Sequence, residues 1–214
     1  MKIIKRFFEL EKKDKIIFFL SLNTIINFFI ALTKITLSLT IPSLWFFING
    51  IFMLTLTFSR FIIIKNYKII KLAKDEKTKQ NIENKTYIHS AILLIFLGII
   101  YYGVSVYMYY KITPNNMHEY LTYLVALVAF YSISSTIYGI IKYKKKDIML
   151  LSIKYTNLAN ALTSIVLTQV VLLSTFGNSN DYRLLNSITG MCSSIIIIIV
   201  GLYMIINKKR KEKL

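Results

Sequence analysis

The chain has 214 residues, of which 55% are hydrophobic and 17% are charged. An ordinary soluble domain carries about 25% charged residues, so the composition argues against an ordinary soluble enzyme. Lys and Arg number 27 against 10 Asp and Glu, which gives a formal net charge of +17. A chain this apolar and this basic is either a nucleic-acid binder or a membrane protein with basic loops. The positions of the charges decide between the two.

Six apolar stretches are each about as long as the roughly 20 residues that a helix needs to cross a bilayer. Their many β-branched residues would favour strands in water. In lipid the backbone must satisfy its own hydrogen bonds, which favours helices instead. We therefore predict an all-α bundle of six transmembrane helices, at Ile16–Leu39, Ser43–Ile64, Tyr87–Tyr110, Met117–Ile141, Ile148–Phe176 and Arg183–Ile206.

The connections between these stretches alternate in charge. Most of the basic residues fall in four segments on one predicted side: residues 1–15, the loop 65–86, residues 142–147 and the tail 207–214. Arg60, at the end of the second predicted span, is counted with that side. The connections on the other side are short and carry almost no charge. This positive-inside pattern predicts cytoplasmic termini and accounts for the charge without a nucleic-acid partner.

The predicted organisation is a single membrane domain over residues 16–206, between basic cytoplasmic segments at 1–15 and 207–214. The loop 65–86 is expected to be solvated and partly helical. The first span is too long for the apolar region of a signal peptide and lacks a small-residue cleavage site, so we expect it to remain as a span. The usage of Ile, Lys and Asn is typical of a low-GC bacterium. We therefore expect a multi-pass protein of the bacterial plasma membrane, with the lipid bilayer as its main partner.

Ionisable groups within a membrane usually bind ions or relay protons. No acidic residue falls in the middle of a predicted span, which argues against a carboxylate site for cations. Two lysines do fall within spans, Lys34 in the first and Lys154 in the fifth. Lys154 lies near the cytoplasmic end and is expected to extend its ammonium group to that surface. Lys34 either reaches the outer surface in the same way or faces the bundle interior, where it would contact an anion.

Uncharged polar residues follow helical spacing on the first and fifth spans. In membranes such residues either hydrogen-bond between helices or line a polar path. Gly190 and Ser194 on the sixth span are small residues four apart, which suits close packing of helices. The candidate polar pathway consists of Asn27, Lys34, Asn49, Thr156, Asn160 and Ser164.

The sequence contains no Gly-rich phosphate loop, no metal-ligand cluster and no nucleophile–base set. Its single cysteine, Cys192, allows no internal disulfide and no cysteine-based zinc site. We therefore expect no catalytic residues, no bound metal and no cofactor, and we do not expect an enzyme.

The order of residues in the first two spans is Asn27, Ala31, Leu32, Lys34 and then Ser43 at the start of the second span. In the second half a basic loop leads into the fifth span, and the sixth opens at Tyr182–Gly190 with a small residue near the end of that segment. This order resembles the transmembrane domain of the cation diffusion facilitator family. The resemblance implies a six-span scaffold with cytoplasmic termini, and it makes a homodimer plausible.

The resemblance fails at the metal-binding positions. Members of that family bind zinc or similar ions through His or Asp pairs four residues apart on helices two and five. The corresponding positions here hold Phe52 and Leu56 on the second span and Thr156 and Asn160 on the fifth, and the neighbouring family Asp is Asn49. Divalent metals of this kind need imidazole, thiolate or carboxylate ligands. The resemblance therefore implies a cation-efflux-like scaffold without its metal site.

Two functions remain open. The first is a transporter-like protein for a small neutral or anionic solute, or an ion other than an ordinary divalent metal. The second is a non-transporting membrane scaffold, partner subunit or assembly factor, acting as a homodimer or with an unidentified membrane partner. Efflux of a divalent metal is a less favoured interpretation.

Overall fold

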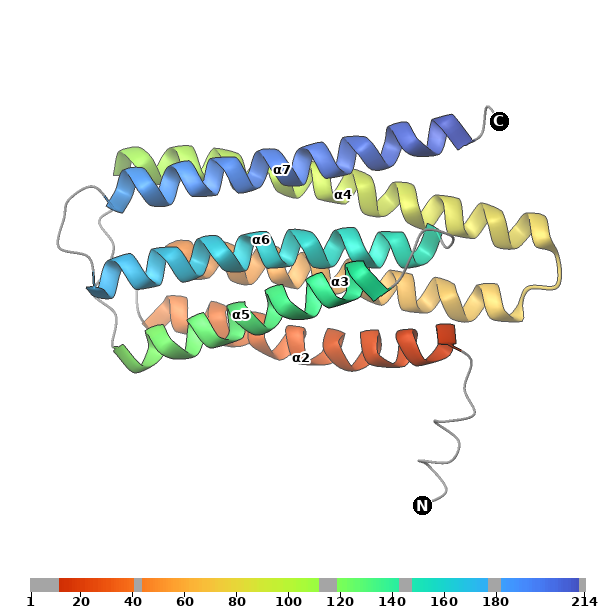
Figure 1. Cartoon of the computed structure of the whole chain (residues 1–214), viewed down its shortest axis with the longest axis horizontal. Coiled ribbons are helices and arrows are strands. Elements are labelled where there is room, and N and C mark those ends of the chain that lie inside the picture. The colour runs from red at the N-terminus through yellow and green to blue at the C-terminus, as the bar shows by residue number, and fades with distance from the viewer. Residues whose placement is uncertain (1–11, 41–43, 112–118, 143–147, 177–181, 212–214) are drawn as a thin grey trace, which may run out of the picture.

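The computed structural model describes residues 12–40, 44–111, 119–142, 148–176 and 182–211. Within these ranges the chain is all-α and contains no strand, as the sequence predicts. Six long helices run back and forth along one axis (Figure 1). They are α2 (Lys12–Thr40), α3 (Leu44–Leu72), α4 (Glu76–Lys111), α5 (Glu119–Lys142), α6 (Ile148–Phe176) and α7 (Tyr182–Lys211).

Five of these helices, all except α5, are long and apolar enough to cross a membrane. In α5 the apolar run among residues with described side chains covers Thr122–Ser134. The helix itself has 24 residues, which is about 36 Å at 1.5 Å per residue. Its length therefore matches that of a spanning helix, although its described apolar run is shorter.

The segment predicted as a partly helical loop is almost wholly helical. Helix α3 continues to Leu72 and α4 begins at Glu76, so only Ala73–Asp75 connects them. Lys and Glu are favourable residues in helices, which permits both helices to extend beyond their apolar parts. Hydropathy alone does not reveal such an extension, because it detects lipid-facing residues and not helical backbone.

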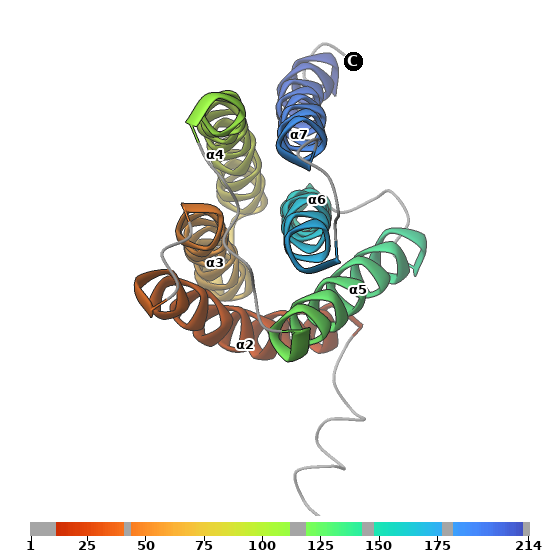
Figure 2. The same ribbon diagram turned by 90° about the vertical axis from the view of Figure 1, so that its left-hand side faces the viewer.

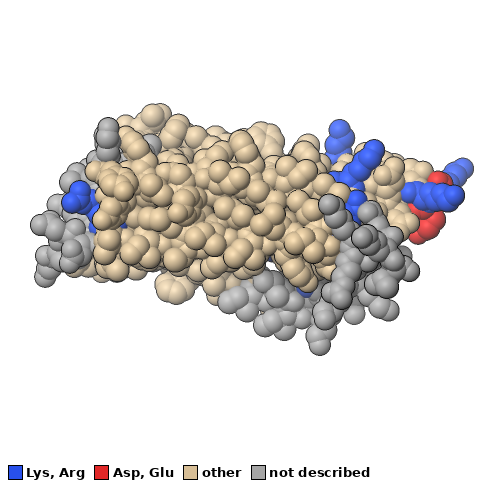
Figure 3. Space-filling model, turned by 90° about the horizontal axis from the view of Figure 1, so that it is seen from above, with Lys and Arg blue, Asp and Glu red and all other residues tan. Residues whose placement is uncertain are grey.

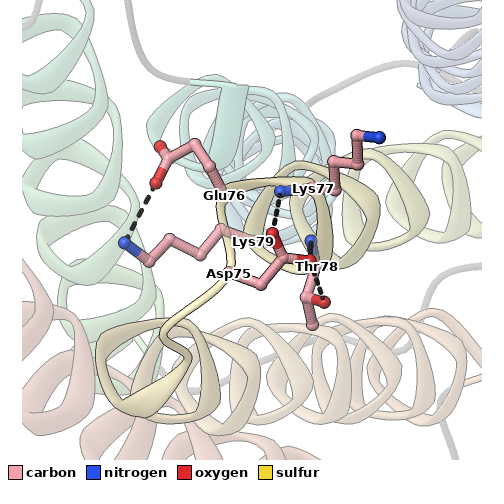
Figure 4. Close-up of polar contacts among 5 residues, drawn as sticks. All are labelled: Asp75, Glu76, Lys77, Thr78 and Lys79. Carbon is pink, nitrogen blue, oxygen red and sulfur yellow. Dashed lines mark hydrogen bonds and ion pairs between the residues drawn. The ribbon is translucent and has the colours of Figure 1, made fainter.

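Asp75 caps the start of α4 (Figure 4). Its carboxylate accepts hydrogen bonds from the Thr78 hydroxyl at 2.9 Å and from the backbone amides of Lys77 at 3.3 Å and Thr78 at 3.2 Å. The first amides of a helix have no partner within the helix, and an aspartate at this position satisfies them. The hydrogen bond from the Thr78 hydroxyl, and then that from the Lys77 amide, hold the pKa of Asp75 below its ordinary value.

Polar contacts join the helices at the same end of the bundle. The Asp14 carboxylate at the start of α2 accepts hydrogen bonds from the Tyr67 hydroxyl at 2.8 Å and from Lys71 Nζ at 2.6 Å. The Asn66 amide of α3 donates to the Thr86 hydroxyl of α4 at 2.7 Å. Most of the Lys and Arg residues on the face drawn in Figure 3 lie at this end, and a broad middle band of that face carries no charge.

The main hydrophobic core lies between α3, α4, α6 and α7. Helix α6 occupies the centre, since it packs against α3, α4, α5 and α7 (Figure 2). Helix α2 packs mainly against α3, and α5 packs mainly against α6. A second buried cluster joins Ile17 and Leu20 of α2 to residues of α3 and α6.

Glycines bring α4 and α7 together at backbone distance. A Cβ atom on Gly98 would lie 2.6 Å from Ile198 Cγ1 and 3.2 Å from the Ser194 carbonyl oxygen. A Cβ atom on Gly201 would lie 2.6 Å from Ile95 Cγ1. Small residues allow this close approach between membrane helices. Ser194 does lie at a close helix contact, as its size suggests, and the opposing small residue is Gly98.

Candidate functional site

A cavity of about 180 Å³ lies between α2, α3, α5 and α6. Helices α2 and α5 both line it, but they are not among the helix pairs that pack closely. We call it the polar cavity, because many of the side chains that line it are charged or carry a hydrogen-bonding group. These are Asn23, Asn27, Lys34, Arg60, Ser132, Thr136, Asn157, Asn160 and Ser164.

Two cations of the polar cavity are almost fully withdrawn from the surface. Lys34 is 9% exposed and Arg60 is 2% exposed. Gly50 of α3 lies beside Ala31 and Ile35 of α2. Gly50 and Lys34 therefore lie at about the same height along the bundle. Arg60 follows Gly50 by ten residues, so about 15 Å of helix separates the levels of the two cations. The cavity therefore extends along the bundle, with one cation near each end.

The expected place of Arg60 at the cytoplasmic end of the second span is wrong. Because α3 continues to Leu72, Arg60 lies twelve residues before the end of the helix, or about 18 Å. Its guanidinium is buried inside the bundle and lines the polar cavity. For Lys34, the interior orientation is the correct one of the two predicted alternatives, since the side chain is buried against the same cavity.

Neither cation has an anionic partner among the residues whose side chains are described. Two ion pairs of the described residues, Lys71–Asp14 and Lys79–Glu76, include no residue that lines the cavity. Arg60 Nε is buried and has no hydrogen-bond partner among the described residues. A buried charge without a partner is costly in a low-dielectric interior. The polar cavity is therefore a place where an anion would be stabilised.

Amides and hydroxyls surround the two cations. The Asn160 amide donates to the Ser132 hydroxyl at 3.0 Å, and the Ser164 hydroxyl donates to the Asn160 carbonyl oxygen at 2.8 Å. Asn157 Oδ1 is buried and has no hydrogen-bond partner among the described residues. The amide N–H groups of the asparagines can donate to the oxygen atoms of a solute, whereas the proton of the Ser164 hydroxyl is already used within α6.

Four of the six predicted pathway residues meet at this cavity: Asn27, Lys34, Asn160 and Ser164. Thr156 does not line it, since its buried hydroxyl donates to the carbonyl oxygens of Ser152 at 3.1 Å and Ile153 at 2.9 Å in its own helix. Asn49 does not line it either.

Asn49 is buried on α3, where its side chain interacts with the hydroxyl of Tyr101 on α4. Phe52 and Leu56, at the positions of the family's metal ligands, are also in the core. The Phe52 ring lies 5.5 Å from the Tyr101 ring in an edge-on contact. The residues of α3 that reach the polar cavity are Met53 and Arg60 instead.

Most hydroxyls of the polar stripe of α6 are satisfied within their own helix, which is neither of the two roles expected from the spacing. The hydroxyls of Thr163, Ser164 and Thr168 donate to carbonyl oxygens within the helix. Hydrogen bonds between helices join α5 to α6, including Thr122–Thr175 at 2.6 Å and Asn160–Ser132 at 3.0 Å. The Asn160 contact lies on the cavity wall, so this residue both connects helices and lines the cavity.

Sequence reasoning missed Arg60 and Asn157 as cavity residues. A charge inside an apolar stretch was the available signal for Arg60, but the lysines that begin five residues later suggested a helix end. Lys154 is half-buried and does not line this cavity. Within the described ranges no three or more His, Cys, Asp or Glu side chains come together as a metal site would require.

Comparison with known proteins finds no family model that matches the chain and no curated protein similar to it in sequence. The polar cavity itself is therefore the basis for inferring a function.

Proposed function

We propose that this chain is a transporter-like integral membrane protein that takes a small anionic solute into the polar cavity. In this proposal all six helices cross the plasma membrane of a bacterium and both termini are cytoplasmic. The observation that carries the proposal is the burial of Lys34 and Arg60 around one cavity without a carboxylate partner among the described side chains.

The sign of the charge favours an anion over a metal ion. Two buried cations repel a divalent metal, and they attract an anion more strongly in a low-dielectric site than in water. The amide N–H groups of the neighbouring asparagines supply further hydrogen bonds to an anionic head group. The cation-efflux-like scaffold suggested by the sequence would then carry different chemistry, with Met53 and Arg60 on the cavity wall.

The distribution of charge supports the proposed orientation. The end of α3, the start of α4 and the end of α7 are rich in lysine and lie at the same end of the bundle. Lysine and arginine near span ends are concentrated on the cytoplasmic side of membrane proteins. The ends of the helices that carry these residues are therefore proposed to face the cytoplasm.

The proposal is tested by flux into proteoliposomes that contain the purified full-length protein. The probes are methanesulfonate and inorganic phosphate as anions, with K⁺ and Zn²⁺ as cations. We expect the wild type to move at least one of the anions and neither cation. We expect Lys34→Met to lower that flux by about tenfold or more, since a charge-assisted hydrogen bond is worth about 1.5–3 kcal/mol.

The matched control is Lys154→Met, which removes a lysine from a proposed membrane helix at a position that does not line the polar cavity. We expect this variant to keep the wild-type flux. An equal loss of flux in both lysine variants would contradict a specific role for Lys34. If the wild type moves neither anion, the transporter proposal is wrong, and a non-transporting membrane subunit becomes the better interpretation.

A further inference from the structure

A second cavity adjoins the polar cavity. It has a volume of about 250 Å³ and shares Ile30, Lys34, Val128 and Ser164 with the first. The rest of its wall is almost wholly apolar, so we call it the apolar cavity. The side chains that make it so are Leu37, Phe46, Leu124, Val125, Ala129 and Leu167.

The two cavities follow one another along the bundle. On α2 the polar cavity is lined from Asn23 to Lys34, and the apolar cavity from Ile30 to Leu37. On α6 the polar wall ends at Ser164 and the apolar wall continues to Leu167. On α5, which runs in the opposite direction, the apolar wall lies earlier in the chain, from Leu124 to Ala129. The apolar cavity is therefore displaced toward one end of the bundle, and Lys34 lies where the two meet.

The wall between α2 and α5 reaches the lipid-facing surface. Ile26, Leu127 and Tyr131 line the polar cavity and are 44%, 70% and 64% exposed. Leu124 of the apolar cavity is 60% exposed. A side chain that lines a cavity and is also exposed marks the rim of an opening. A ligand could therefore reach both cavities from the side, between two helices that do not pack closely.

We infer that the ligand of this site is an amphipathic anion, with its charged head at Lys34 and a single alkyl chain in the apolar cavity. The inference rests on the proposed function and names the class of solute. The head group would be held by the ammonium group of Lys34, a residue that lines both cavities. Ser164 also lines both cavities. Arg60, deeper in the polar cavity, adds to the attraction for negative charge.

The chemistry on either side of Lys34 explains why the head and the tail would be distinguished. A methylene group gains free energy when it leaves water for an apolar site, and a charged group loses it unless it is paired. The polar cavity is lined by cationic and amide side chains, which bind the charged head, and the apolar cavity is lined by hydrocarbon side chains, which bind the alkyl chain. A small inorganic anion would fill only the first of these.

The test is the thermal stability of the purified full-length protein in non-ionic detergent, titrated with methanesulfonate, butanesulfonate and octanesulfonate. Sulfonates keep their charge across the usable pH range, so only chain length changes along this series. We expect octanesulfonate to bind at least about tenfold more tightly than methanesulfonate by free concentration, since each buried methylene favours binding by about fourfold. Octanol, which has the chain without the charge, should not stabilise the protein.

Two variants separate the tail from the head. Val125→Phe enlarges a wall residue of the apolar cavity and should remove the gain with chain length while keeping the response to methanesulfonate. Val106→Phe makes the same change on α4, whose residues line neither cavity, and should leave the gain intact. Lys34→Met should remove the response to octanesulfonate, and Lys154→Met should retain it.

The outcomes distinguish this inference from the proposed function. Equal stabilisation by methanesulfonate and octanesulfonate would be consistent with an anion site, but it would contradict the inference that the ligand has an alkyl chain in the apolar cavity. Stabilisation by octanol would overturn the role of charge. Stabilisation by phosphatidylglycerol in mixed micelles but not by octanesulfonate would replace the single chain by a two-chain lipid. No response to any anion would overturn the anion site and the proposed function with it.

Discussion

Lys34 and Arg60 are the residues at which function and stability conflict most clearly. Insertion scales assign about 2.5–3.5 kcal/mol to a lysine or arginine at the centre of a membrane helix. A lysine near a helix end lowers this cost by extending to the surface, but both of these side chains are buried against the bundle interior. A cost of this size without a structural partner is typical of a functional site.

This conflict predicts the behaviour of variants without charge. Lys34→Met and Arg60→Met keep most of the side-chain volume and remove the buried charge, so each should leave the unliganded protein as stable as the wild type or more stable, by up to about 3 kcal/mol. Thermal or denaturant unfolding in detergent, in a buffer without amphipathic anions, measures the change. A clear loss of stability in either variant would show that the charge has a structural partner, and would argue against an empty anion site.

At the residue scale the sequence predicted part of the site. It singled out Lys34 because a lysine inside an apolar stretch is conspicuous, and it found Asn27, Asn160 and Ser164 through helical spacing. Thr156 has the same spacing but satisfies its hydroxyl within its own helix. Spacing places residues on one face of a helix, but the packing of the other helices determines whether that face meets a cavity or the core.

At the scale of helices, α4 and α7 form the most closely packed pair. Gly98 and Gly201 each face a backbone carbonyl of the other helix, at positions where a Cβ atom would lie 3.2 Å from Ser194 O and 3.0 Å from Ala91 O. Without a hydrophobic driving force between helices in lipid, such close packing supplies much of their association. The pair contributes no residue to either cavity. It packs against α3 and α6, two of the helices that line the cavities.

Enlarging a glycine in this pair should therefore destabilise the fold. We expect Gly98→Val to lower the free energy of unfolding by about 1–3 kcal/mol, the usual range for overpacking. Gly103→Val is the matched control on the same helix, because a Cβ atom there meets nothing within 4 Å. The measurement is reversible unfolding in detergent, compared with the amount of monodisperse protein on size exclusion. Equal effects of the two changes would contradict the close packing at Gly98.

Helix type was predictable from composition, and helix ends were less so. The predicted fifth span coincides with α6, because its apolar run ends where the helix ends. The ends of α3 and the start of α4 differ from the predicted spans by eight and eleven residues, because lysine-rich sequence continues the helix. The resulting displacement of Arg60 from a surface position to an interior one is the main consequence for the site.

At the scale of the whole molecule, the charges lie mostly at one end and the cavities lie between the ends. The sequence predicts orientation from the lysine-rich segments, and among the described residues the end of α3, the start of α4 and the end of α7 lie at one end of the bundle. It does not predict which four helices surround the cavities. Hydropathy gives the length of each helix, whereas the pairing of α2 with α3 and of α5 with α6 depends on packing between helices.

The orientation is tested by cysteine labelling in intact cells with a reagent that does not cross membranes. In a Cys192→Ala background, cysteines at Asn115 and Ser179 should label from outside, and a cysteine at Thr78 should label only after the cells are opened. The physical reason is the excess of lysine around Thr78, which is retained on the cytoplasmic side. Labelling of Thr78→Cys in closed cells, with none at Asn115→Cys, would reverse the orientation.

The cavity between α2, α3, α5 and α6 is proposed to accept negative charge through Lys34 and Arg60. Electrical recording from proteoliposomes on a solid support measures this directly, because a concentration jump of methanesulfonate produces a transient current when a charged solute binds or crosses. We expect a current with the sign of inward-moving negative charge in the wild type and in Lys154→Met, and none in the double variant Lys34→Met, Arg60→Met. A current on a jump of K⁺ or Zn²⁺ and none with the anion would contradict the account.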